Sequence, residues 1–304
     1  MADIYFLNDF NRAELVPLVI ALGNFDGVHF GHRKLLETVV TESIKSNAVP
    51  TVWSLKYENK QYITSIKEKI KLFESIGIKI AIFEEFNNIY EYSPDKFVRE
   101  ILIDKFNCRT AICGFNFHFG HNCVGTSDTL DELMRVYKRN CIVIPPVKYD
   151  NEIISSTLVR KLISDGDMEY VRNVSGHPFS VENVVISGNR IGHKIGVPTI
   201  NQIFPAGQII PAYGVYCTRC KIDNITYNCV TNVGIRPTIN ISENGPQVNC
   251  ETHIINFNED LYGVELKVDF YKYLRSEKKF DSLDGLKKAI VFDIKKAEEY
   301  LKNV

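Results

Sequence analysis

The alternation of strand-like and helical segments in the first half of the chain is the feature that most constrains its fold. The strand-like runs are Leu15–Leu22, Val49–Leu55, Ile78–Phe83, Thr110–Cys113 and Cys141–Ile144, and the helical stretches are Lys34–Ser46, Ile66–Ile76, Pro94–Phe106 and Asp128–Arg139. Strands separated by helices are typical of a parallel sheet of α/β type. Ligands of such sheets bind beyond the carboxyl ends of the strands, so the loops there are candidate sites.

The pattern changes near residue 181 to short β-rich runs with little helix. These runs are Val181–Ser187, Gly214–Ile222, Ile225–Val233, Glu251–Phe257 and Val264–Leu274, and a final helix is predicted over Ser282–Lys302. Several strands at this spacing predict a small antiparallel barrel or sandwich. A helical piece over Ser156–Asn173 and a turn at Gly176–Pro178 precede the change. We therefore predict two domains, residues 1–180 and 181–304.

Composition narrows the class of protein. A chain of 304 residues has room for two cores, and a net charge of −1 argues against a general nucleic-acid surface. The first residues lack a signal peptide and no stretch is long enough to span a bilayer, so the expected location is the cytoplasm, without a membrane partner. The eight cysteines are then expected to be reduced thiols. Cys217 and Cys220 form a C-x-x-C within a strand-like run, without a second pair for zinc.

Glycines and histidines gather where the first strand gives way to a helix. Residues 23–32 read Gly-Asn-Phe-Asp-Gly-Val-His-Phe-Gly-His, with glycines at three positions that suit a tight turn or close approach to a ligand. A helix N-terminus has unpaired N–H groups and partial positive charge, so a triphosphate can bind there. His29 and His32 would add donors to the phosphate oxygens. A capping or surface role is the simpler alternative for either histidine alone.

This segment resembles the His-x-Gly-His signature of the nucleotidyltransferase superfamily, in the form seen in bacterial bifunctional riboflavin kinase/FAD synthetases. The resemblance implies a Rossmann-like nucleotidyltransferase domain with catalytic histidines at 29 and 32. It also implies that Gly23, Asn24, Phe25 and Gly31 bind ATP and that Asp26 contacts the flavin.

Residues 154–160, Ile-Ser-Ser-Thr-Leu-Val-Arg, resemble the second signature of the same superfamily. The hydroxyl groups alone would make a good helix cap. Hydroxyls with an arginine at a helix start also bind phosphate, because arginine makes bidentate contacts. The resemblance assigns Ser156, Thr157 and Arg160 to the triphosphate.

The segment Gly114–Gly120 has phenylalanines spaced by two, which is equally typical of core aromatics at a strand end. It resembles the family's Gly-Phe-Asp-Phe-Arg-Phe-Gly segment, which implies that Gly114, Asn116, Phe117 and Phe119 bind the flavin. Asn116 replaces the usual aspartate, and a histidine at position 118 replaces the usual arginine. A further departure lies at residues 54–57, where the family tends to have an acidic or His-Pro element.

In the second half, residues 188–196 form a glycine-rich stretch followed by Pro-Thr-Ile-Asn at 198–201. Glycines with basic residues between them suit a loop over phosphates. The tetrapeptide resembles the riboflavin kinase motif Pro-Thr-Ala-Asn. By that resemblance Thr199 and Asn201 hold Mg²⁺ and the ATP phosphates, and Gly188 and Gly192 contact ATP. One hydroxyl and one amide are oxygen ligands of the kind that magnesium prefers.

Glu251 is expected to begin a strand, where a solvated carboxylate is the commoner role. The resemblance assigns it as the catalytic base for the ribityl 5′-hydroxyl, and it places Arg275 at the flavin. Matches at residues 214–216, 232–238 and 279–283 extend the resemblance almost to the end of the chain. They imply an antiparallel β-barrel riboflavin kinase domain with a C-terminal helix.

The resemblance as a whole implies an enzyme with two activities. The barrel would phosphorylate riboflavin with ATP to give FMN, and the α/β domain would join FMN to the AMP part of a second ATP, giving FAD and pyrophosphate. The expected partners are riboflavin, FMN and ATP, without nucleic acid, and the expected state is a monomer or weak homo-oligomer. Three alternatives stay open: one retained activity, a non-catalytic flavin or nucleotide sensor, and nucleotidyl transfer to another phosphorylated substrate.

Overall fold

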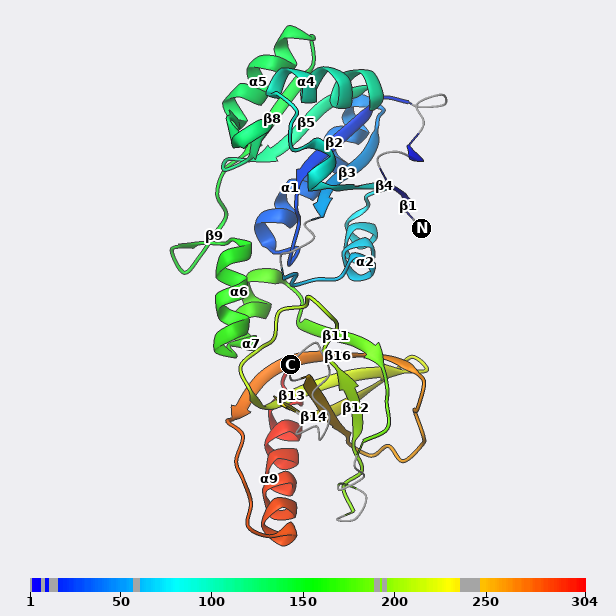
Figure 1. Cartoon of the computed structure of the whole chain (residues 1–304), viewed down its shortest axis with the longest axis vertical. Coiled ribbons are helices and arrows are strands. Elements are labelled where there is room, and N and C mark those ends of the chain that lie inside the picture. The colour runs from blue at the N-terminus through cyan, green and yellow to red at the C-terminus, as the bar shows by residue number, and fades with distance from the viewer. Residues whose placement is uncertain are drawn as a thin grey trace. The chain divides into compact units, whose positions relative to one another are not determined.

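The computed structural model describes residues 2–6, 9–10, 16–56, 61–188, 192, 196–235 and 247–304 (Figure 1). The chain divides into two compact units, Met1–Ser156 and Thr157–Val304. Helices α6 (Ser156–Asp165) and α7 (Met168–Ser175) fall almost wholly in the second unit, because α7 contacts two of its strands. The domain boundary predicted at residue 180 stays a prediction.

The first unit contains a parallel six-stranded sheet with helices on both faces, as predicted. Its strand order is β1-β4-β3-β2-β5-β8, and every neighbouring pair is parallel. The elements are β1 (Asp3–Phe6), β2 (Leu18–Gly23), α1 (Phe30–Ser46), β3 (Val49–Lys56), α2 (Ile66–Ile76), β4 (Ile80–Glu85), α3 (Phe86–Ile89), α4 (Pro94–Lys96), the π-helical η2 (Phe97–Lys105), β5 (Cys108–Gly114), β6 (His118–Phe119), the 3₁₀ turn η3 (His121–Cys123), β7 (Gly125–Thr126), α5 (Ser127–Val136), β8 (Asn140–Ile144), β9 (Lys148–Tyr149) and β10 (Glu152–Ile153).

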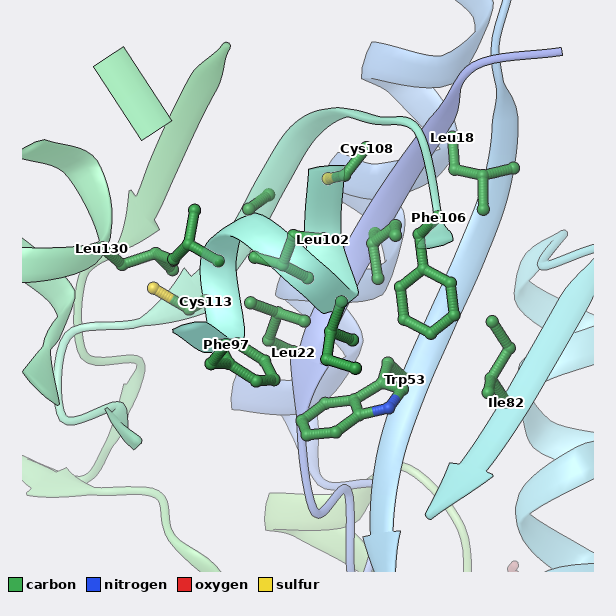
Figure 2. Packing of buried hydrophobic residues seen from close by; sticks show 14 of the residues in the cluster. Leu18, Leu22, Trp53, Ile82, Phe97, Leu102, Phe106, Cys108, Cys113 and Leu130 are labelled. Carbon is green, nitrogen blue, oxygen red and sulfur yellow. The ribbon is translucent and has the colours of Figure 1, made fainter. Parts of the chain in front are cut away.

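Strand β2 lies in the middle of the sheet and is apolar on both faces. Leu18, Ile20 and Leu22 point into one core, whose members Trp53, Phe97, Leu102 and Leu130 are shown in Figure 2. Val19 and Ala21 point into a second core under α1 and α2. Because side chains alternate along a strand, a run without polar residues has to be buried on both sides. This explains why β2 reads as a continuous apolar run.

The order of the strands places a switch point between β2 and β5. From β2 the chain adds β3 and then β4 on one side, and it then crosses back to add β5 on the other side of β2. The loops after β2 and β5 therefore leave the same edge of the sheet in opposite directions. Ligands of open α/β sheets bind at such a point, beyond the carboxyl ends of the strands. The loops found there begin at Asn24 and at Phe115.

The second unit contains a nearly closed antiparallel barrel, as predicted. Its strand order is β11-β16-β13-β14-β15-β12. The elements are β11 (Phe179–Val184), β12 (Ile200–Ile203), β13 (Gly214–Ile222), β14 (Ile225–Ile235), β15 (Val248–Ile254), β16 (Glu265–Arg275) and α9 (Leu283–Leu301). Helix α9, red in Figure 1, packs on β13 and β14 with Ala297 and Leu301 against Val215, Cys217 and Val230.

The barrel closes through polar side chains rather than through a full strand ladder. A single bridge joins Ile186, after β11, to Asn201 on β12. Beyond it, the Asn183 amide donates to the carbonyl of Ile203 at 2.8 Å. The buried Gln202 amide donates to the carbonyls of Asn183 and Leu266 at 2.7 and 2.8 Å. These bonds satisfy backbone groups that a closed ladder would otherwise pair.

Two local predictions were wrong. The helical piece over Ser156–Asn173 is two helices, because Gly166 adopts a left-handed φ of 82° that ends α6. Glu251 does not begin a strand but lies in the middle of β15. Several short strands were not predicted, among them β1 and β12, since segments of four residues or fewer carry too little periodicity. In the described ranges, no helix is long and apolar enough to cross a bilayer.

We expect Gln202→Leu to destabilise the barrel by about 2 kcal/mol, because it removes the donors to two backbone carbonyls. The change should appear as a lowered unfolding transition of the full chain in scanning calorimetry. The exposed Lys221→Leu on β13 serves as the control and should change stability by no more than about 0.5 kcal/mol. Equal stability of the two variants would contradict closure through the Gln202 amide.

Candidate active sites

The turn between β2 and α1 has a strained backbone. Phe25 and Val28 have φ values of 52° and 34°, and Gly27 has a φ of 84°. A positive φ is a genuine outlier for a bulky or β-branched residue and costs of the order of 1–3 kcal/mol at each position. Such a backbone persists only where its surroundings hold it, and it is common in active sites.

Hydrogen bonds from three parts of the first unit hold this turn. The Asn24 carbonyl accepts from Ser54 Oγ on β3 and from Lys69 Nζ on α2, both at 2.9 Å. The buried Asp26 carboxylate accepts from the backbone N–H groups of Ile63 and Thr64 at 2.9–3.2 Å. These contacts fix the turn against the sheet and against the segment before α2.

The start of α6 supplies a further bond, because Ser156 Oγ donates to the Asp26 carbonyl at 2.9 Å. The two predicted phosphate-binding segments, around residues 26 and 156, are thus tied together. Thr157 is exposed and Arg160 is half-buried on the same helix. Their assignment to the triphosphate stays a prediction, as does the assignment of Asp26 to the flavin.

His29 and His32 lie together at the start of α1. His29 is the N-cap residue, and its Nδ1 accepts from the backbone N–H of His32 at 3.3 Å. The two rings stack with centroids 3.7 Å apart and planes 16° apart. Since Nδ1 of His29 accepts, a neutral His29 carries its proton on Nε2 and can donate from there. A Cβ at Gly31 would lie 3.1 Å from the His29 ring, so this glycine leaves room for the stack.

His32 is held in its neutral form. Burial, the neighbouring His29 and then the Lys69 cation keep the pKa of His32 well below its ordinary value of 6.5. Its Nδ1 is buried and has no hydrogen-bond partner within the described residues. The ring also packs against Phe25, with centroids 5.3 Å apart, and Phe25 is itself buried and packs edge-on against Phe73.

The second predicted loop of the first unit follows β5. Gly114 ends that strand, and a Cβ there would lie 3.2 Å from Asn116 Oδ1. Asn116 is exposed, Phe117 is half-buried and Phe119 is buried in the core, where its ring stacks on that of Phe117 at 5.6 Å. Phe119 is therefore a core residue, whereas Asn116 is exposed beside the switch point. Flavin binding by this loop stays a prediction.

In the second unit, four predicted site residues line one cavity of about 220 Å³: Gly192, Thr199, Glu251 and Arg275. Its wall from β16 to α9 includes apolar side chains, among them Phe280, Leu286 and Ile290. A second cavity of about 560 Å³ also reaches Thr199 and is lined by Val185, Ile254, Phe257 and Leu261. Thr199 therefore lines both cavities.

Two glycines of the glycine-rich stretch, Gly188 and Gly192, lie close to the segment 197–201. A Cβ at Gly188 would overlap the Asn201 amide, and a Cβ at Gly192 would overlap the Val197 carbonyl. His253 Nδ1 lies 2.8 Å from the Pro198 carbonyl and supports the segment from β15. The rest of the glycine-rich stretch, residues 189–191 and 193–195, lies outside the described residues, as do Tyr57 and residues 236–238 of the quoted motifs.

The Thr199 hydroxyl and the Asn201 amide oxygen fit a magnesium ion in chemical type, since both are neutral hard oxygen donors. Asn201 is buried, and its Oδ1 accepts from Asn249 at 3.0 Å, which leaves a lone pair of this oxygen for a cation. Within the described residues, no group of three or more His, Cys, Asp or Glu side chains is placed to hold a metal. Cys217 and Cys220 are buried in β13, and burial raises the pKa of Cys217 to about 12.

Arg275 is held by the buried Asp293 of α9. Its guanidinium donates from Nε and Nη2 to the Asp293 carboxylate at 2.7–3.1 Å, a bidentate pair. The pair joins the end of β16 to α9 and fixes the arginine at the cavity wall. Glu251 is exposed at the cavity mouth and accepts from Asn249 Nδ2 at 3.1 Å.

Sequence reasoning missed Ser54, Lys69, Asn249 and Asp293. The sequence did contain a signal for Lys69, because this lysine lies in the apolar stripe of α2 with Ile66, Ile70 and Phe73. Lysine is almost never fully buried unless it is paired, so a lysine in this stripe indicates a bonding partner in the interior. Ser54 lies in the segment that departs from the family pattern, and its hydroxyl donates there to the Asn24 carbonyl. Asn249 and Asp293 gave no signal, since a single polar residue in a strand or helix is usually exposed.

Comparison with known proteins finds relatives of both units. The FAD synthetase family model matches residues 11–158, and the riboflavin kinase family model matches residues 175–301. The bifunctional riboflavin kinase/FMN adenylyltransferase of Bacillus subtilis (strain 168) is 31% identical, over 96% of this chain and 95% of that protein. The enzyme of the same name from Buchnera aphidicola subsp. Schizaphis graminum is 34% identical, over 92% of this chain and 93% of its own.

The fold also resembles that of a solved structure over both units. The crystal structure of a macrolide-efflux protein from Streptococcus pneumoniae superimposes with a TM-score of 0.84 at 26% identity, covering 98% of this chain and 97% of that one. From the two family models and the full-length relatives, the chain belongs to the bifunctional riboflavin kinase/FMN adenylyltransferase family.

We expect Lys69→Met to raise the pKa of His32 toward 6.5, because the cation that helps to keep the ring neutral is lost. An NMR titration of the histidine Cε1–H signals, with His32→Gln for assignment, measures this directly. Lys69→Arg keeps the positive charge and should leave the pKa of His32 nearer to the wild-type value. An unchanged His32 titration in Lys69→Met would show that burial and the neighbouring His29 set this pKa without Lys69.

Proposed function

We propose that this chain phosphorylates riboflavin to FMN with ATP and then adenylylates FMN with a second ATP to give FAD and pyrophosphate. The observation that carries the proposal is the barrel cavity in which Thr199, Glu251 and Arg275 meet, together with the histidine pair at the helix start of the other unit. Membership of the bifunctional family supports both steps.

In the kinase step, Glu251 accepts the proton of the flavin's terminal ribityl hydroxyl. The hydroxyl oxygen forms a bond to the γ-phosphorus of ATP while the bond from that phosphorus to the bridging oxygen breaks, so FMN and ADP are the products. The protein's contribution is positioning and charge stabilisation, as in other phosphoryl transfers. Thr199 and Asn201 would hold Mg²⁺, which neutralises phosphate charge when bound.

The two cavities beside Thr199 suit the two substrates. The smaller one reaches Glu251 and has the apolar wall formed by Phe280, Leu286 and Ile290, so we assign it to the flavin. The larger one is lined by apolar side chains, among them Val185 and Ile254, and by the polar residues Asn258, Glu259 and Asp260. We assign it to the adenosine of ATP, which has both an apolar base and ribose hydroxyls that can donate to carboxylates. Because Thr199 borders both, the transferred phosphate would lie at this residue.

In the adenylyl step, an FMN phosphate oxygen attacks the α-phosphorus of ATP, and the bond to the β-phosphate oxygen breaks to release pyrophosphate. The start of α1 offers backbone N–H groups and the positive end of the helix to the phosphates. His29 donates from Nε2, and the neutral His32 adds a second imidazole beside it. The enzyme forms no covalent bond to the substrate in this step, because the incoming phosphate is itself the nucleophile.

We also place the enzyme in the cytoplasm. All eight cysteines are free thiols, and Cys220 and Cys229 stay unlinked although their sulfur atoms are 3.5 Å apart. Thiols persist in this form in a reducing compartment.

We expect the double variant His29→Ala and His32→Ala to abolish FAD formation while FMN formation continues. Wild-type enzyme incubated with riboflavin, ATP and Mg²⁺ should yield FMN and then FAD by chromatography, whereas the variant should accumulate FMN. Loss of both activities from a folded double variant would contradict two separate sites. Tight flavin binding without turnover by the wild type would favour a sensor.

We expect Glu251→Gln to lower the rate of FMN formation by about 10²–10⁴-fold, the usual contribution of a general base. The same preparation should convert added FMN to FAD at the wild-type rate, because the adenylyl step uses residues of the other unit. A kinase rate within threefold of wild type would remove Glu251 from the role of base.

A further inference from the structure

Asn249 on β15 contacts two of the residues assigned to the kinase step. Its side chain is buried, with 4% exposure, and Nδ2 donates to Asn201 Oδ1 at 3.0 Å and to Glu251 Oε1 at 3.1 Å. Both acceptors need a donor, and one amide nitrogen carries two protons, so a single NH₂ group serves both.

We propose that Asn249 is a positioning residue of the kinase site, which fixes the Asn201 amide oxygen and the Glu251 carboxylate relative to each other. The inference rests on the proposed kinase function. In the proposed role Asn249 does not contact the substrate. It determines the orientation of the cation ligand Asn201 and of the base Glu251.

The strand register explains how one side chain reaches both groups. Asn201 on β12 lies directly opposite Glu251 on β15, so their side chains leave the barrel wall on the same face. Asn249 is two residues from Glu251 on the same strand and therefore shares that face. It is diagonal to Asn201, because its own partner on β12 is Ile203. A long polar side chain spans such a diagonal.

The cost of burying Asn249 argues for a role in the site. Its Oδ1 is buried and has no hydrogen-bond partner within the described part of the chain. A buried acceptor without a partner lowers stability, and in native proteins each such group calls for an explanation. The use of the NH₂ end by Asn201 and Glu251 is that explanation, since a shape-matched apolar residue would avoid the cost.

Charge supplies a further reason for an amide here. Without a donor between them, the Asn201 oxygen and the Glu251 carboxylate would present only lone pairs to each other, and they would separate. The amide NH₂ of Asn249 removes this repulsion without adding net charge beside a site for anionic phosphates and a cation. Leucine at 249 would supply neither proton, and aspartate would add a second carboxylate next to Glu251.

The test uses the full-length enzyme with two near-isosteric substitutions, Asn249→Leu and Asn249→Asp. We expect each to lower the kcat of riboflavin phosphorylation by about 10–100-fold, the effect of a small misplacement of reacting groups, with the KM for riboflavin changed less than threefold. Conversion of added FMN to FAD by the same preparation should stay at the wild-type rate, which shows that the first unit is folded, while the apparent Tm reports on the barrel.

Thr218→Val is the matched control. Thr218 is also a buried polar residue of the barrel, bonded to Thr231 Oγ1 at 2.7 Å, and it lines neither cavity. We expect it to lower the apparent Tm while kcat stays at the wild-type value. Asn249→Leu should lower the Tm no more than this control does, because it also removes the unpartnered oxygen.

The outcomes separate the two proposals. A kcat of Asn249→Leu and Asn249→Asp within twofold of wild type, in an enzyme that does phosphorylate riboflavin, overturns the role of Asn249 alone. A loss of kcat in Asn249→Leu that is restored in Asn249→Asp would indicate polar packing and also overturns it. Absence of riboflavin phosphorylation in the wild type and in Thr218→Val overturns the kinase function, and the role of Asn249 with it.

Discussion

Hydrogen bonds to the turn after β2 hold the first unit's site together. The turn has a positive φ at Phe25 and Val28, so it would relax if it were not tied down. Ser54 and Lys69 bind the Asn24 carbonyl, and the Asp26 carboxylate binds the backbone before α2. The histidine pair depends on these bonds, because the turn leads directly into the start of α1 and sets the direction in which both rings point.

In the barrel, side-chain amides hold the site residues and the closing strands in place. Gln202 and Asn183 complete its closure, and Asn249 joins Asn201 to Glu251 at the cavity. In both units, buried polar side chains hold the groups that we assign to the substrates. Such side chains are effective because their geometry is specific and because a lost partner is costly in a dry interior.

The proposed chemistry requires different electrostatics in the two units. The first unit offers a helix start and the pair of His29 and the neutral His32 to phosphates that carry negative charge throughout the reaction. The second offers a carboxylate to a neutral hydroxyl, beside oxygen ligands for a cation. Lys69 and Asp293 each position another group of the site. Lys69 holds the Asn24 carbonyl, and Asp293 holds Arg275.

The sequence by itself determined the parallel sheet and an antiparallel barrel or sandwich, because strand and helix periodicity and turn residues are local properties. The family resemblance of its motifs then favoured the barrel and indicated the two motif-bearing turns. It also predicted α2 at its observed bounds, Ile66–Ile76. Only the tertiary structure decided that Gly192, Thr199, Glu251 and Arg275 share a cavity, and that Lys69 and Asn249 are buried against the sites. Those facts depend on strand order and register, which bring together residues far apart in the chain and leave no periodic trace in it.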